Sequence, residues 1–464
     1  MSNQSQRGNK VPSYDRLRAI ACDPDATVHF VGVGGISMYS LARLTMLLGA
    51  GVSGSDRAEN ERTSELLLLG AKIKIGHSPD NIGAVDLVVR THAVGEDNPE
   101  LRAAVSRGII IVSRAEYMAA LMLDYSYRIG VSGSHGKSTT VAMLDCIFTR
   151  AMRRPTVLSG ANLSHGEPFR IGDKGLMIYE GCEYKDSFLK FMPDIAVGLN
   201  LELDHTDYFA DIDALTDSFI RALGRAKQFA LISGDDPNLQ KVKQNLPCRV
   251  VSFGSGDNND YRYFITSFNE VGFDFSISRF GSCVEEFKLN IPGVFNLHNA
   301  TAAIAVALEC GIDTEIIKEA ISSYRGIEGR LEYIGDRHGR QVYYDYAHHP
   351  TEIRATVNAL KMLTGRPVTA VFKPHTFSRT KSLWSDFVGA LSVSDYTIIT
   401  DIFPAREEPI EGISSQRLAS DIGGRALYCP DNDVADALDR YTSGVILLMG
   451  AGDFKEIRKR TLKK

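Results

Sequence analysis

The fold class of this chain is decided by the stretch GVSGSHGKSTT at residues 130–140. An apolar run precedes it, and the residues that follow have the apolar spacing of a helix, which predicts a strand, a glycine-rich turn and a helix start. Glycines let backbone N–H groups approach phosphate oxygens, and the N-terminus of a helix favours an anion. Lys137 can contact the β- and γ-phosphates of a nucleoside triphosphate, and the Ser138 hydroxyl can bind Mg²⁺.

This loop departs from the usual spacing of a phosphate-binding loop, G-x-x-x-x-G-K-[ST]. Gly130 lies six positions before Gly136 and Gly133 only three, so the loop is a shortened variant. A glycine turn that only joins a strand to a helix is the structural alternative. We favour phosphate binding, because folding alone does not require Gly-Lys-Ser-Thr-Thr at the start of a helix.

Length and composition are those of an ordinary globular protein. The chain has 464 residues, enough for about three domains, and a net charge of −5 that gives no sign of a nucleic-acid partner. It has no apolar run of about 18 residues and no signal-peptide segment, so we expect no membrane insertion. Seven scattered cysteines without a C-x-x-C pair indicate reduced thiols and a cytoplasmic location.

A second strand–turn–helix unit lies near the start of the chain, in TVHFVGVGGISM. Its turn contains Gly32, Gly34 and Gly35, which allow a ligand to approach the backbone. The next strand ends at Asp56, about twenty residues further on, where a carboxylate can reach a ribose hydroxyl. This is a Rossmann-like unit, but Ser37 stands where the dinucleotide fingerprint has its third glycine. A nicotinamide cofactor and a turn without a ligand therefore both stay open.

Two further apolar strands end in polar residues. One leads into Glu180 and Glu183, and the other runs into His205. Because ligands of open α/β sheets bind beyond the carboxyl ends of the strands, we expect these residues to converge with Lys137 on one crevice. Carboxylates and the Ser138 hydroxyl suit Mg²⁺, and a neutral His205 can complete a second cation site.

The remaining polar motifs leave more than one interpretation. His298 and Asn299 open an alanine-rich helix, where helix capping is the alternative to a ligand contact. The third block, from about residue 326, again alternates strands and helices and predicts a parallel sheet with helices on both faces. His348 and His349 suggest zinc, but adjacent histidines rarely point the same way and no third ligand is spaced nearby, so we expect no structural zinc site.

Together these motifs resemble those of the Mur ligases, the ATP-dependent amide-forming enzymes of peptidoglycan synthesis. The resemblance covers nearly the whole chain, and the motifs follow in the family's order. They are HFVGVGGISM (29–38), GSHGKSTT (133–140), EGCEYKDSFL (180–189), NLELDHTDYF (200–209), HN (298–299), DYAHHPTEI (345–353), KPHTFSRT (373–380) and MGAGDF (449–454).

The resemblance implies an α/β chain of three domains. These are a Rossmann-like, UDP-sugar-binding domain at residues 1–125, a central P-loop-type ATPase domain at 126–325, and a Rossmann-like C-terminal domain at 326–464 that closes on ATP and binds the amino acid. The first glycine turn then holds a UDP pyrophosphate rather than a nicotinamide cofactor. The residues expected at the UDP-sugar are Gly32, Gly34, Gly35, Ile36, Ser37, Ser55, Asp56 and His77.

The resemblance also implies ATP and Mg²⁺ as cofactors. Ser138, Glu180 and His205 are expected to bind Mg²⁺, with Glu183 as the second choice for the carboxylate. The residues expected at ATP are Gly133, Ser134, His135, Gly136, Lys137, Ser138, Thr139, Asn299, Arg330 and Asp345.

Specific roles follow for several of these residues. Asn299 is expected at the adenine, Arg330 at the γ-phosphate and Asp345 at the ribose. His348 and Arg379 are expected near the incoming amino acid, where Arg379 would pair with its carboxylate. The expected catalytic set is Lys137, Glu180, His205, His348 and Arg379.

The implied reaction joins L-alanine to the carboxylate of UDP-N-acetylmuramate, catalysed by a cytoplasmic monomer or homodimer. The muramate carboxylate attacks the γ-phosphorus of ATP, and the amine of L-alanine then attacks the resulting acyl phosphate. Three alternatives stay open: a ligase that attaches a recycled tripeptide, a ligase for another small amino acid, and a UDP-sugar sensor without catalysis.

The chain departs from the family pattern at several sites. Serines replace two threonines of GTHGKTTT, and two acidic positions of EADESD are lost although both glutamates remain. Ala302 stands where HNxxN has its second asparagine, which affects one adenine contact. Thr376 replaces the first arginine of PHRYSRT beside the amino-acid site, which bears on the choice of acceptor.

Overall fold

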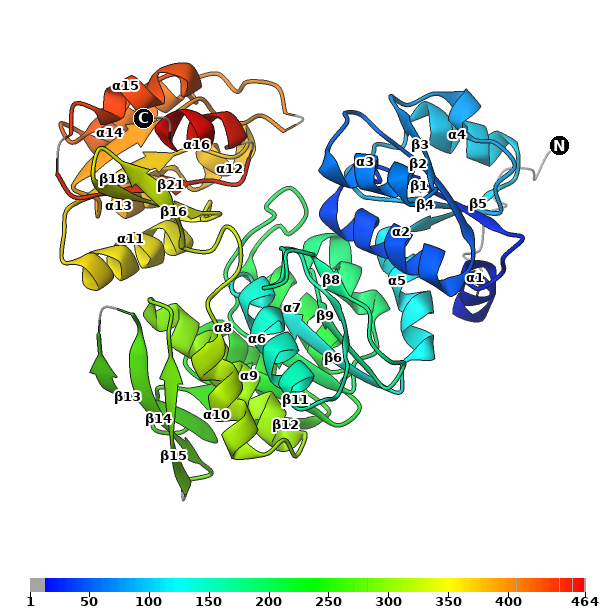
Figure 1. Cartoon of the computed structure of the whole chain (residues 1–464), viewed down its shortest axis with the longest axis horizontal. Helices are drawn as coiled ribbons and strands as arrows, with labels where there is room; N and C mark the ends of the chain where they lie inside the picture. The colour runs from blue at the N-terminus through cyan, green and yellow to red at the C-terminus, as the bar shows by residue number, and fades with distance from the viewer. Residues whose placement is uncertain are drawn as a thin grey trace.

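The computed structural model describes residues 13–462 apart from residues 270, 282, 406, 442 and 453. Residues 1–12 and 463–464 of the expected outer domains lie outside the described part, as does Asp453 of the MGAGDF motif. The described chain has three α/β domains, each built on its own sheet (Figure 1). Within the described part, no helix is long and apolar enough to cross a membrane.

The first domain is a parallel sheet with helices packed against it. Its strand order is β3 (Lys72–Ile75), β2 (Gly51–Asp56), β1 (Thr27–Val31), β4 (Leu87–Arg90) and β5 (Ile110–Ser113). The strand order reverses at β1, and ligands of such sheets bind at that point. The helices are α1 (Tyr14–Ala21), α2 (Ile36–Leu48), α3 (Glu61–Leu68), η1 (Pro79–Asn81), α4 (Pro99–Ser106), α5 (Arg114–Leu121) and η2 (Met122–Asp124).

The central domain has the largest sheet. Its order is β15 (Cys283–Leu289), β14 (Phe273–Arg279), β13 (Tyr261–Phe268), β12 (Arg249–Gly254), β11 (Phe229–Ser233), β10 (Ile195–Gly198), β6 (Tyr127–Ser132), β9 (Leu176–Glu180), β7 (Thr156–Leu158) and β8 (Phe169–Arg170). Strands β13 to β7 are parallel, whereas β14, β15 and β8 pair antiparallel. The helices are α6 (Lys137–Arg150), η3 (Tyr184–Lys190), α7 (Ile212–Leu223), α8 (Pro237–Gln244), α9 (Val294–Glu309) and α10 (Thr314–Ser323).

The third domain is parallel except at one edge. Its order is β16 (Glu332–Arg337), β17 (Arg340–Asp345), β21 (Val445–Met449), β18 (Val368–Phe372), β19 (Tyr396–Ile399) and β20 (Ala426–Tyr428). Its helices are α11 (Pro350–Thr364), α12 (Phe377–Ser382), α13 (Trp384–Leu391), α14 (Ser415–Ile422), η4 (Asp431–Asp433), α15 (Val434–Leu438) and α16 (Lys455–Leu462).

The expected all-parallel sheet is wrong at that edge. Strand β16 runs antiparallel to β17, because a two-residue turn joins them. The turn residues His338 and Gly339 both have positive φ, at 48° and 76°, as tight hairpin turns require.

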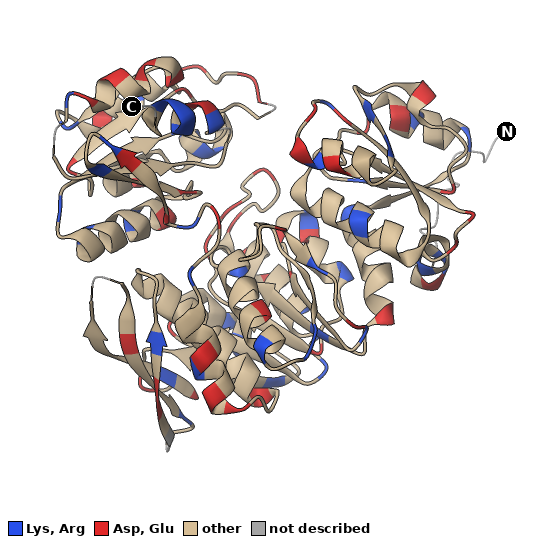
Figure 2. Cartoon of the chain, viewed as in Figure 1, with Lys and Arg blue, Asp and Glu red and all other residues tan. Residues whose placement is uncertain are grey.

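The first and central domains share one apolar core. A single buried cluster contains Phe30 and Tyr117 of the first domain together with Phe169, Tyr179 and Phe219 of the central domain. The third domain has two clusters on the two faces of its sheet, and Phe295 of the central-domain helix α9 packs against one of them. Charged residues are frequent on the outer helices and loops, and the strands at the centre of the sheets have few of them (Figure 2).

Candidate functional site

The turn between β6 and α6 is the GSHGK loop of the sequence. Gly136 is the N-cap of α6 and has a φ of 82°, a left-handed conformation that glycine adopts without strain. A Cβ at this position would lie 2.4 Å from Asn299 Oδ1, because α9 packs directly against the loop. Because Gly136 is the N-cap of α6, the loop lies at the positive end of the α6 dipole.

Lys137 is held inside this loop. Its ammonium group donates to the carbonyl oxygens of Gly133 and Ser134. It also donates to both carboxylate oxygens of Glu183, each 3.2 Å away. The Glu183 side chain is only 4% exposed, so this is a buried ion pair. Burial works against the charge of Lys137, but Glu183, Cys182 and Glu180 outweigh it and raise the pKa of Lys137.

The residues expected to bind Mg²⁺ lie around this lysine. His205 Nε2 is 3.7 Å from Glu183 Oε1, and His205 has a strained φ of 55°. Glu180 ends β9 and accepts hydrogen bonds from Ser159 Oγ at 3.1 Å and from the Gly160 backbone at 2.5 Å. Glu183 thus lies between Lys137 and His205. From the sequence, Glu183 was the second choice, after Glu180, for the carboxylate that binds Mg²⁺.

A cavity of about 1080 Å³ joins the first glycine turn to this lysine. Seven of the eight residues expected at the UDP-sugar line it, namely Gly32, Gly34, Gly35, Ile36, Ser37, Asp56 and His77. Lys137 and Glu180 line its other end. Sequence reasoning did not find Arg57, Thr91, His92 and Arg114, which also line it, because they stand outside the glycine motif.

Ser55 does not line this cavity. It is fully buried behind it, where its hydroxyl donates to Glu100 at 2.6 Å and lies 3.1 Å from His77 Nδ1. Glu100 also lies 3.5 Å from His77 Nδ1, so Ser55 and Glu100 orient the imidazole from behind. Asp56 accepts the Gly34 backbone N–H at 2.8 Å, so one of its oxygens stabilises the turn itself.

A second cavity of about 320 Å³ lies between the central and third domains. Six of the residues expected at ATP line it: His135, Gly136, Thr139, Asn299, Arg330 and Asp345. Tyr263, Phe295 and His298 also line it, together with the carboxylates of Glu202 and Glu352. Aromatic and aliphatic walls with a few polar groups suit a nucleotide base.

Helix capping does not explain His298 and Asn299. Helix α9 begins at Val294 with Gly293 as its N-cap, so both residues lie inside the helix.

Asp345, at the end of β17, accepts the backbone N–H groups of Leu331 and Ala347, each at 2.7 Å. Its burial raises the pKa of Asp345 to about 6, although Arg330 works against the shift.

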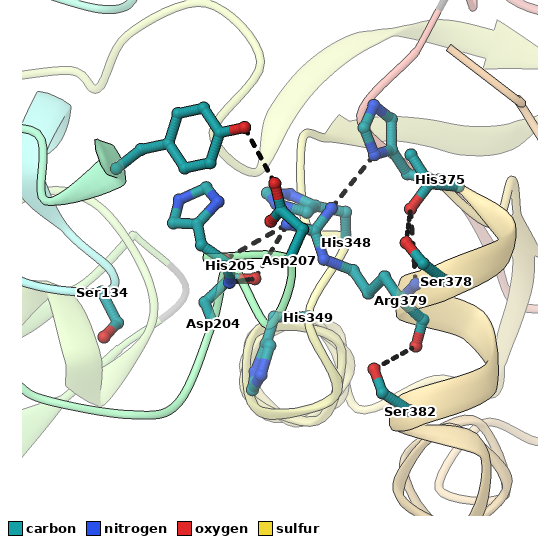
Figure 3. Close-up of polar contacts among 12 residues, drawn as sticks. Ser134, Asp204, His205, Asp207, His348, His349, His375, Ser378, Arg379 and Ser382 are labelled. Atoms are coloured by element: carbon teal, nitrogen blue, oxygen red, sulfur yellow. Dashed lines mark hydrogen bonds and ion pairs between the residues drawn. The ribbon is translucent and has the colours of Figure 1, made fainter. Parts of the chain in front are cut away.

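Arg379 joins the third domain to the central domain. Its Nη2 donates to both oxygens of Asp204, at 2.9 and 3.2 Å, and its Nη1 lies 3.0 Å from His375 Nδ1 (Figure 3). Burial works against the Asp204 charge, but Arg379 outweighs it and lowers the pKa of Asp204. Burial lowers the pKa of the neighbouring His348 to about 4, which keeps this imidazole neutral.

His135 makes a second contact between these two domains. Its Nδ1 lies 3.0 Å from Glu352 Oε1 of α11, and its Nε2 lies 3.1 Å from Glu202 Oε2. Burial works against protonation, but the two carboxylates raise the pKa of His135 to about 9. Sequence reasoning missed Glu202, Asp204 and Glu352, although each stands within a motif that it singled out.

Family profiles match the chain in three consecutive segments. The profile described as Mur ligase family, catalytic domain, matches residues 27–126. The Mur ligase middle domain matches residues 131–307, and the Mur ligase, glutamate ligase domain, matches residues 329–452. Two of the three matches therefore include one of the glycine turns described above.

Individual proteins match over nearly their whole length. The UDP-N-acetylmuramate–L-alanine ligase of Clostridium tetani is 38% identical over 451 residues, covering 95% of this chain and 98% of its own. The enzyme of the same name from Clostridium kluyveri is 40% identical, covering 93% and 96%. The structure of the UDP-N-acetylmuramate-alanine ligase MurC of Thermotoga maritima has a TM-score of 0.81 at 26% identity, covering 94% and 98%.

Proposed function

This chain belongs to the Mur ligase family, and from that premise we propose that it joins L-alanine to the carboxylate of UDP-N-acetylmuramate with ATP. The observation that carries the proposal is the 1080 Å³ cavity, which connects a diphosphate-type glycine turn to the lysine of a triphosphate-type loop. A dehydrogenase has no use for that second loop. A pure UDP-sugar sensor has no use for the buried Lys137–Glu183 pair.

The UDP-sugar fits the large cavity. Its diphosphate would lie at the N-terminus of α2, where the first N–H groups of the helix and its dipole favour an anion. The sugar end then points toward Lys137 and Glu180, which line the far end of the cavity. His77, oriented from behind by Ser55 and Glu100, offers its other ring nitrogen to the nucleoside half.

ATP fits the smaller cavity and the GSHGK loop. The middle-domain match implies ATP binding, and the cavity wall of Asn299, Arg330 and Asp345 supports the roles expected for them at adenine, γ-phosphate and ribose. Oxygen donors also fit Mg²⁺, with Ser138 and Glu183 or Glu180 as ligands and His205 beside them. When bound there, Mg²⁺ would neutralise charge on the transferring phosphoryl group.

The chain's own groups then favour two successive displacements. The muramate carboxylate attacks the γ-phosphorus and ADP leaves, while Lys137 and the α6 dipole stabilise the negative charge. The amine of L-alanine attacks the carbonyl carbon of the acyl phosphate, and inorganic phosphate leaves. Arg379 has a guanidinium with further N–H donors beyond those used by Asp204, so it can hold the carboxylate of L-alanine. Neutral His348 can accept a hydrogen bond from the amine.

Phosphate release tests this proposal. Purified protein with ATP, Mg²⁺ and UDP-N-acetylmuramate should release phosphate when L-alanine is added, and the Lys137→Ala variant should not. Lys241→Ala, which changes an exposed lysine on α8, is the matched control and should retain full activity. Release with a tripeptide but not with L-alanine would select the peptide ligase instead, and no release with any acceptor would refute ligation.

The same function implies a cytoplasmic location, because ATP is its co-substrate. The six cysteines whose side chains are described are all free thiols, in agreement with a reducing compartment. We propose a monomer or a homodimer.

A further inference from the structure

Two histidines and one carboxylate meet at the boundary between the central and third domains. His135 Nε2 lies 3.1 Å from Glu202 Oε2, and His349 Nδ1 lies 3.4 Å from the same oxygen. The two imidazole rings are 5.0 Å apart, and the three side chains each offer a ligand atom within 4.8 Å of the others. The residues come from the loop before α6, the loop after β10 and the start of α11, so they meet only through the fold.

Glu352 holds the first of these histidines in the orientation of a metal ligand. Its Oε1 lies 3.0 Å from His135 Nδ1, which directs the opposite nitrogen, Nε2, toward Glu202. Its other oxygen accepts the backbone N–H groups of His348 and His349, at 3.0 and 3.2 Å, so Glu352 is itself fixed. A carboxylate bound to the remote nitrogen of a histidine is the usual support of a metal-binding imidazole.

The second histidine is buried, and its nitrogen that faces Glu202, Nδ1, is only weakly hydrogen-bonded. The His349 side chain is 7% exposed, and within the described part of the chain its Nε2 has no hydrogen-bond partner. Its Nδ1 accepts only a long hydrogen bond, 3.4 Å, from the Thr351 backbone. His348 turns the other way, toward His375 and Arg379 (Figure 3). Adjacent histidines thus diverge as expected, but the partners of His349 come from another domain.

We propose that His135, Glu202 and His349 form a Zn²⁺ site that ties the third domain to the central domain. Two imidazole nitrogens and one carboxylate oxygen are a donor set for Zn²⁺ rather than for Mg²⁺, which prefers oxygen ligands. Three protein ligands leave a fourth position for water or a phosphate oxygen. This site is separate from the Mg²⁺ ligands of the proposed reaction, and it stands whether or not the chain is a ligase.

Because the metal would join two domains, Zn²⁺ at saturation should slow any turnover that requires them to separate.

Metal titration of the full chain tests the site. Zn²⁺ is titrated calorimetrically in excess Mg²⁺, and Co²⁺ is titrated by its visible absorption. The variants His135→Asn, Glu202→Gln and His349→Asn should each weaken Zn²⁺ binding at least about tenfold. Asparagine at position 349 keeps an N-cap for α11, so the helix start is preserved. His165→Asn and His338→Asn, which change exposed histidines, are the controls and should bind Zn²⁺ as the wild type does.

Location of the metal completes the test. Anomalous scattering at the zinc edge should place one ion between His135 and His349. An ion at Glu180, Glu183 or His205 instead, or unchanged Zn²⁺ binding by all three variants, would overturn the proposal. If a variant unfolds, the wild-type Co²⁺ spectrum decides, since a spectrum of octahedral, water-bound Co²⁺ would equally overturn it.

Discussion

Replacing Lys137 by methionine should both destabilise the central domain and abolish ligation, and the two effects should be separable. The lysine ammonium lies 3.2 Å from each oxygen of Glu183, whose side chain is 4% exposed. Methionine keeps most of the apolar stem of the side chain but leaves the carboxylate buried without its cation. The loss therefore measures an unpaired buried charge rather than a cavity.

The magnitude follows from the geometry of the pair. Two unit charges at this separation attract by about 5 kcal/mol at an effective dielectric constant of about 20. Desolvation offsets part of that attraction, and removal of one partner from a buried pair costs about 3–5 kcal/mol. For a domain of about 150–250 residues, each kcal/mol of lost unfolding free energy lowers the melting temperature by about 2–4 °C. The melting temperature should therefore fall by about 6–20 °C.

A double variant separates stability from catalysis. Lys137→Met/Glu183→Gln removes both charges. Scanning fluorimetry should therefore show that the double variant recovers at least half of the decrease in melting temperature seen in Lys137→Met. Phosphate release should stay at least about 10³-fold below the wild type in both variants, because the cation at the transferring phosphoryl group is missing. UDP-sugar binding, followed by calorimetry, should be nearly unchanged in both.

Two results would refute this reasoning. If the double variant melts as low as the single one, the unpaired carboxylate is not the cause of the instability. If the single variant melts like the wild type, the pair contributes nothing to stability. A loss of UDP-sugar binding equal to the loss of ATP binding would instead mean that Lys137 does not belong to the ATP site alone.

Three further predictions concern other parts of the site. Arg379→Ala should raise the KM for L-alanine at least about tenfold by loss of a charge-assisted pair, with the KM for ATP nearly unchanged; steady-state kinetics with the reverse pattern would remove Arg379 from the acceptor site. Gly136→Ala should weaken ATP binding and cost about 1–3 kcal/mol, because its Cβ would lie 2.4 Å from Asn299 Oδ1 at a φ of 82°; an unchanged ATP affinity in calorimetry would contradict the steric argument. Protonated His135 contributes stability that is fully present below its ordinary pKa of 6.5 and is lost as the pH rises through about 9. The difference in melting temperature between the wild type and His135→Asn should therefore shrink between pH 6.5 and about 9. A constant difference would show that the charge of His135 is not involved.

The sequence was most informative where chemistry depends on neighbouring residues. Glycines, Lys137 and Ser138 stand within one loop, so residue types alone predicted a strand, a phosphate-binding turn and a helix, and β6 and α6 confirm those elements. Strands that alternate with helices predicted the α/β class, whereas the resemblance to the Mur ligases, through the order of the motifs, implied the three-domain architecture.

Contacts between distant segments could not be predicted. His135 and Glu352 are 217 positions apart, and no periodicity indicates which loop of one domain meets which helix of another. The same limit applies to Ser55 and Asp56. The sequence places both residues beside the glycine turn, but it does not indicate that Ser55 contacts Glu100 and that Asp56 contacts Gly34. The sequence also did not indicate that β14 and β15 pair antiparallel at one edge of the central sheet.

The shared apolar core of the first and central domains has a consequence for how the molecule moves. Phe169 of the central domain packs on Tyr39 of α2, with ring centroids 5.9 Å apart, within one continuous buried cluster. Sliding these two domains apart would expose that surface to water, whereas the contacts of Arg379 and Glu352 with the central domain are polar and can be replaced by contacts with water. The first two domains should therefore behave as one rigid body in hydrogen exchange and unfold as one cooperative unit. The third domain, whose cores, among the described residues, include no buried residue of the other two and meet the central domain at Phe295, should open and melt independently of them.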